Sequence, residues 1–110
     1  MQSRRDVATG LLQRIGDPGY RLRGENPSTA TLEQARQWAA MYDKLIDLKR
    51  ELLGLCERYA DQAEPLLARA IRETDMILLE VQVSCFQQKR DYWTIRATEL
   101  AGNGRRGGTN

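Results

Sequence analysis

The hydrophobic residues between positions 31 and 60 follow the spacing of a long amphipathic helix. Large apolar side chains recur at alternating intervals of three and four residues, which places them on one face of an α-helix. They are Trp38, Met41, Leu45, Leu48, Leu52, Leu55 and Tyr59. Thr31 and Gln34 have the spacing of a capping box at the start of this helix. A neighbouring row widens the apolar face, so we expect the helix to contact two neighbours: Leu32, Ala39, Ile46, Leu53 and Ala60.

A second helix is predicted from about Pro65 to Leu100, with an apolar row of the same spacing. The row consists of Leu67, Ile71, Thr74, Leu78, Val81, Cys85, Gln88, Tyr92 and Ile95. Thr74 and Gln88 are polar members, which we expect to set the register at some cost in stability. Residues 79–85 also alternate as a strand does, but no turn signals flank them and no second strand is available for pairing.

The two predicted helices are joined by a tight reversal at residues 61–64. Pro65 has no N–H to donate and belongs in a first helical turn, and Asp61 with Glu64 has capping spacing. The alternative is one long kinked helix. A reversal here pairs Leu48 with Leu78, so the two apolar rows are expected to bury each other. We call these two rows the seam residues.

The fold predicted from these patterns is all-α: a long antiparallel two-helix hairpin, coiled-coil-like, over residues 31–101. Residues 1–30 are predicted to form a short helix and a turn-rich connector. The helix covers residues 4–15, with Val7, Leu11, Leu12 and Ile15 grouped on one face. Residues 102–110 contain four glycines and no apolar residue, so we expect a disordered tail.

A further apolar stripe lies outside the seam on the second helix. Leu79, Phe86, Trp93 and Leu100 are spaced by seven residues, with Met76 and Val83 beside them. A soluble monomer rarely leaves such a stripe in water, and aromatic residues on a rigid helix often anchor interfaces. These six residues are therefore the predicted protein interface. Three occupants are open: residues 4–22, a different protein, or a second hairpin that completes a four-helix bundle. A two-helix hairpin has little core of its own, which favours the homodimer.

Composition places this pattern in a soluble protein. Of 110 residues, 41% are hydrophobic and 29% charged, and the net charge is +2. The chain is too apolar for a disordered protein and too charged for a membrane protein. It has no apolar run of 18 residues and no signal-peptide core near its start, so we expect an intracellular, cytoplasmic location and no membrane contact.

The absence of histidine argues against enzymatic chemistry. It removes the usual general base, the Ser/His and Cys/His nucleophile pairs, and most zinc or di-iron sites. We therefore predict no catalytic residues, metal or cofactor. The predicted hairpin separates Cys56 from Cys85 by roughly 22 Å along its axis, which excludes a disulfide between them. Both are expected to be small buried residues in a reducing compartment.

The predicted function is that of a non-enzymatic interaction or regulatory protein, acting as a homodimer through apolar helix surfaces. The alternative is nucleic-acid binding through the basic ends of the chain. Its candidate contacts are Arg4, Arg5, Arg21, Arg23, Arg105 and Arg106. Against this alternative, both predicted helices are balanced in charge, and neither carries a run of arginines like a recognition helix.

Overall fold

The structure, a computed structural model, describes residues 21–108, with side chains as far as Asn103. It contains three helices in this range: α2 (Leu32–Gln62), α3 (Pro65–Glu73) and α4 (Asp75–Gly108). The described part of the chain has no strand, so the all-α prediction is confirmed and the strand-like alternation at residues 79–85 is helical. The helix predicted at residues 4–15 lies outside the described residues.

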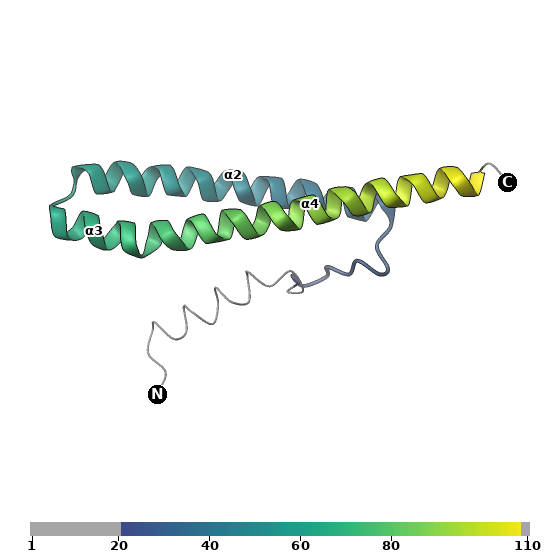
Figure 1. The fold of residues 1–110 in the computed structure, drawn as a ribbon, viewed down its shortest axis with the longest axis horizontal. Helices are drawn as coiled ribbons and strands as arrows, with labels where there is room; N and C mark the ends of the chain where they lie inside the picture. Colours follow the sequence, from purple (N-terminus) through teal and green to yellow (C-terminus); the bar gives the residue numbers. More distant parts are fainter. Residues whose placement is uncertain (1–20, 109–110) are drawn as a thin grey trace, which may run out of the picture.

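The helices form two long arms that run in opposite directions. Helix α2 is one arm, and after a sharp reversal α3 and α4 run back alongside it (Figure 1). A connector, residues 21–30, precedes α2 and contains turns but no helix. We refer to α2 together with α3 and α4 as the helix pair.

Helix α2 begins where its capping box predicts. The Thr31 hydroxyl oxygen accepts a hydrogen bond from the Gln34 amide at 3.2 Å, and the Gln34 side chain accepts one from the Thr31 amide at 2.9 Å. These reciprocal bonds satisfy two of the amides that a helix N-terminus leaves without intrahelical partners. The predicted capping box is confirmed.

The reversal also lies at its predicted position, but its predicted cap is wrong. Helix α2 ends at Gln62, and Pro65 occupies the first turn of α3. Glu64 is the N-cap residue, yet its side chain makes no capping hydrogen bond. Asp61 instead accepts a hydrogen bond from Arg72 at 2.8 Å, an exposed ion pair between the two arms. Asp61 belongs to the last turn of α2, and its side chain binds Arg72 of α3 instead of capping the start of α3.

The second arm is two helices rather than the single helix predicted. Helix α3 ends at Glu73, and Thr74 has φ −121° and ψ −85°, which is not helical. The Thr74 hydroxyl donates to the Ala70 carbonyl at 2.6 Å, a side-chain bond that competes with the backbone ladder and bends helices. Thr74 is exposed and marks this break.

The second arm also extends further than predicted. Helix α4 continues to Gly108, so its expected end at Leu100 is too early, whereas the disordered tail at residues 102–110 stays a prediction from the sequence. Extending an existing helix adds one hydrogen bond per residue without a new nucleus. This gain offsets the low helix propensity of glycine.

Candidate functional site

The two arms pack through a different face of α2 from the one predicted. The buried residues of α2 are Ala35, Tyr42, Ile46 and Ala60. Ile46 and Ala60 directly follow the seam residues Leu45 and Tyr59. Successive residues in a helix are rotated by about 100° about its axis. When Ile46 and Ala60 point toward the other arm, Leu45 and Tyr59 therefore point sideways, along the edge between the two arms.

The stripe predicted as an open interface belongs to this inward face. Trp93 has no exposed surface and Leu79 is buried, while Phe86, Leu100, Met76 and Val83 are partly buried. The Trp93 ring stacks on Trp38 at 6.1 Å between centroids, and Phe86 lies 5.8 Å from Tyr42. Helix α2 therefore covers this stripe, an occupant that the three sequence-based alternatives did not include. Leu79 and Trp93, two of the six residues of the predicted interface, are therefore buried within the chain itself.

The choice of inward face follows from side-chain size. Each buried aromatic side chain removes about 150–250 Å² from water, more than a leucine does. The inward face buries Trp93 and Tyr42, and Trp38 of the α2 seam packs against them, whereas the two other seam aromatics, Tyr59 and Tyr92, are exposed. Ala35, Ala60 and Ala68 are the small partners that allow the arms to approach. Both rows repeat every three or four residues, so spacing alone does not distinguish them.

Apart from Cys85, which is buried, the seam residues of both arms lie on the side of the helix pair that carries the connector. The connector lines one groove with Trp38 and Met41, at the beginning of the α2 seam. It lines another with Tyr92 and Ile95, at the end of the α4 seam. A third groove between α2 and α4 contains no seam residue and is lined largely by alanines and threonines. The seams thus lie side by side rather than against each other.

Beyond the connector, toward the reversal, most apolar seam residues of both arms are exposed or partly buried. Leu48 is 47% exposed, Leu55 54% and Tyr59 62%. Leu52 and Leu67 are also exposed, and the remaining members are partly buried. We call this surface the seam face: Leu45, Leu48, Leu52, Leu55, Tyr59, Leu67, Ile71, Leu78 and Val81. Contiguous apolar surfaces on two adjacent helices mark interaction sites.

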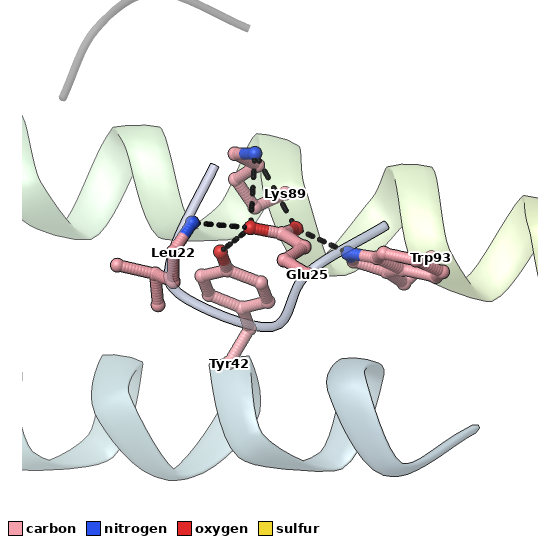
Figure 2. A network of polar contacts seen from close by, with 5 residues as sticks. All are labelled: Leu22, Glu25, Tyr42, Lys89 and Trp93. Atoms are coloured by element: carbon pink, nitrogen blue, oxygen red, sulfur yellow. Dashed lines mark hydrogen bonds and ion pairs between the residues drawn. The ribbon is translucent and has the colours of Figure 1, made fainter. Parts of the chain in front are cut away.

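A buried carboxylate fixes the connector over one end of the seam face. The side chain of Glu25 is 1% exposed and reaches between α2 and α4 (Figure 2). Its Oε1 accepts hydrogen bonds from the Tyr42 hydroxyl and the Leu22 amide, both at 2.9 Å. Its Oε2 accepts the indole N–H of Trp93. The Lys89 ammonium lies 3.4 Å from both oxygens. One side chain therefore joins the connector to both arms.

Local sequence explains how the connector presents this carboxylate. The Glu25 amide donates to the Leu22 carbonyl at 2.9 Å and closes a turn in which Gly24 has φ +87°. That backbone conformation is one that glycine adopts without the strain a Cβ introduces. Asn26 then accepts hydrogen bonds from the amide and hydroxyl of Ser28, which shapes the approach to Thr31.

The environment of Glu25 favours its ionised form. Burial alone raises the pKa of a carboxyl, but the hydrogen bonds from Trp93, Leu22 and Tyr42, together with the charge of Lys89, lower the pKa of Glu25 below its usual value. No buried polar side-chain atom of the described residues lacks a hydrogen-bond partner, and this carboxylate acts as a structural clamp between the connector and the two arms.

Both cysteines lie in the described part of the chain, and both are free thiols. Cys85 is buried, and burial raises the pKa of its thiol, which keeps it protonated. Cys56 is partly buried, and neither cysteine forms a disulfide. Within residues 21–108, no group of three His, Cys, Asp or Glu side chains is placed to hold a metal ion. In the same range, no helix is long and apolar enough to cross a membrane.

Of the arginines predicted to contact nucleic acid, only two have side chains that the structure describes. Arg21 and Arg23 are exposed on the connector. Arg4 and Arg5 precede the described residues. Arg105 and Arg106 lie on the last turns of α4, where the structure describes the backbone alone. Nucleic-acid binding stays a prediction from the sequence.

Two features of the site were not anticipated from the sequence. The spacing predicts an internal seam face, and it does not mark Glu25 as a site residue. The partners of Glu25 at Tyr42, Lys89 and Trp93 are 17, 64 and 68 residues away, so no local pattern marks the carboxylate as buried. The position of Glu25 beside Gly24 indicates a turn with a fixed backbone. It does not indicate which side chains the carboxylate contacts.

Comparison of the chain with protein-family models, with curated proteins and with solved structures found no match.

Proposed function

We propose that this protein is a non-enzymatic interaction or regulatory protein that self-associates through the seam face. The observation that carries the proposal is the exposure of large apolar side chains on two adjacent helices, with Leu48, Leu55 and Tyr59 each about half exposed or more. Surfaces of this kind are buried on association, since the transfer of apolar area out of water is the main driving force for complex formation.

The distribution of the core supports a second copy as the occupant. The largest fully buried side chains, Trp93, Tyr42 and Ile46, lie toward the connector end of the helix pair. Nearest the reversal, the buried residues are Ala60 and Ala68, which remove little apolar surface from water, and the buried Leu79 and Cys85 lie farther along α4. The half of the pair with the weakest core is thus the half that exposes the seam leucines. Two copies placed seam face to seam face bury these leucines and form a four-helix bundle with an isologous interface.

Matched substitutions test the proposal. Leu55→Asp places a charge in the middle of the seam face and is expected to weaken self-association by about tenfold or more, because a leucine contact is lost and a carboxylate is desolvated. Leu66→Asp makes the same chemical change at a 77%-exposed position outside the seam, and Arg50→Ala removes a charge elsewhere on α2. Both controls are expected to self-associate like the wild type.

Sedimentation velocity over a range of concentrations provides the measurement, and circular dichroism checks that each variant is folded. Equal weakening by Leu55→Asp and Leu66→Asp contradicts a specific seam interface. An unchanged association constant for Leu55→Asp contradicts the proposed function.

A further inference from the structure

The place where the chain enters the described structure is set by the Glu25 clamp. Arg21, the first described residue, lines the same groove as Tyr92 and Ile95. The clamp fixes residues 22–25 across the helix pair through Tyr42, Lys89 and Trp93 (Figure 2). Residues 1–20 are joined to the chain at Arg21, which lies at the connector end of the seam face.

The tethered sequence contains an apolar face of suitable size. Residues 4–15 place Val7, Leu11, Leu12 and Ile15 at the spacing of one side of a helix. Twelve residues correspond to about 18 Å of helix, and the seam stretch from Leu45 to Tyr59 to about 21 Å. The intervening residues 16–20 span up to about 17 Å when extended. The connector already lies beside Met41 on α2, and the rise along the helix from Met41 to Leu45, where the seam face begins, is only about 6 Å. The tether is long enough to place this segment on the seam face.

We infer that residues 4–15 dock on the seam face of their own chain and compete there with a second copy. The competition rests on the proposed self-association, whereas the docking itself does not. A tethered segment binds at a high effective concentration, so a modest intramolecular affinity is sufficient to oppose dimerisation. The segment then acts as an intramolecular cover that sets the concentration at which two chains associate.

The full-length variant Leu11→Asp tests this inference. The substitution removes one apolar contact of the cover and leaves the seam face unchanged. Self-association measured by sedimentation velocity is expected to strengthen by about tenfold or more, since burial of one leucine corresponds to more than a decade in an equilibrium constant. Gln13→Asp introduces the same acid at a polar position of the segment and is expected to associate like the wild type.

A second readout separates the cover from self-association. The dye ANS fluoresces when it binds exposed apolar surface. It is added at a protein concentration low enough that the protein in solution has the mass of a single chain. Leu11→Asp is expected to increase ANS fluorescence at least about twofold, and Leu55→Asp in the same chain is expected to reduce this increase.

The outcomes are distinguishable. An increase in ANS fluorescence with stronger dimerisation supports both the cover and the proposed function. An increase without dimerisation at any concentration supports the cover and contradicts self-association. Unchanged ANS fluorescence and unchanged association overturn the cover, whatever the seam variants show.

Discussion

Removal of the Glu25 carboxylate is the perturbation whose effect follows most directly from the structure. In Glu25→Ala, the indole N–H of Trp93, the Tyr42 hydroxyl and the Lys89 ammonium lose their shared acceptor. Each buried donor left without a partner costs about 1–3 kcal/mol, and breaking a buried ion pair costs about 3–5 kcal/mol. These terms overlap, because one cavity admits water to several donors at once. The expected loss is about 3–5 kcal/mol in the free energy of unfolding.

Glu25→Gln separates charge from hydrogen bonding. The amide oxygen continues to accept from one or two donors, but its NH₂ group faces donors and its charge no longer compensates Lys89. We expect a smaller loss, about 1–3 kcal/mol. Urea unfolding followed by circular dichroism at pH 7 measures both variants, with Glu51→Ala as the control because Glu51 is exposed on α2. The argument is refuted if Glu25→Ala is as stable as Glu51→Ala.

The same carboxylate predicts a pH dependence of stability. The folded pKa of Glu25 is lower than that of an ordinary glutamate, so its contribution is fully present above the unfolded pKa. As the pH falls below about 4.5, the unfolded chain binds a proton that the folded chain does not, and stability decreases until the folded pKa is passed. This component is expected to be absent from Glu25→Gln. A wild type and variant that lose stability in parallel between pH 5 and pH 3 contradict the assignment.

Two further predictions concern the inward face and its cysteine. Trp93→Ala is expected to lower the free energy of unfolding by about 3–5 kcal/mol, because it leaves a large cavity against Trp38 and removes one donor to Glu25. Urea unfolding measures this loss. A variant that is as stable as the wild type and loses only self-association contradicts the inward placement of Trp93. Cys85 is expected to react with a thiol reagent more slowly than Cys56 in the native chain at pH 8, because its thiol is buried with a raised pKa; equal native rates contradict this placement.

The elements of the fold were predictable because their signals are local. The Thr31–Gln34 capping box and the proline after the reversal act through neighbouring residues, and both lie where the sequence indicated. The break at Thr74 was not anticipated because a threonine inside a regular apolar row resembles a register-setting polar residue. Thr94 and Thr98 make the same hydroxyl bond to the carbonyl four residues back inside the unbroken α4, so a threonine in a helical row does not by itself indicate a break.

The choice of inward face was not predictable from spacing. On α2, the row with Leu48 and Leu52 and the row with Tyr42 and Ile46 both repeat at helical intervals. The first row contains more leucine, which favours it when only spacing and hydrophobicity are considered. The second row prevails because it meets Trp93 and Phe86 across the pair and because Glu25 satisfies the polar atoms of Trp93 and Tyr42. That compensation depends on residues far apart in the chain.

The central claim is that the seam face is an association surface for a second copy. The solution mass of the full chain, measured by light scattering after size exclusion over a tenfold concentration range, tests it most directly. The single chain has a mass of 12.6 kDa. The account predicts a rise toward twice this mass with concentration, at lower concentration for Leu11→Asp and higher for Leu55→Asp. A single-chain mass for the wild type and Leu11→Asp at every concentration would contradict it.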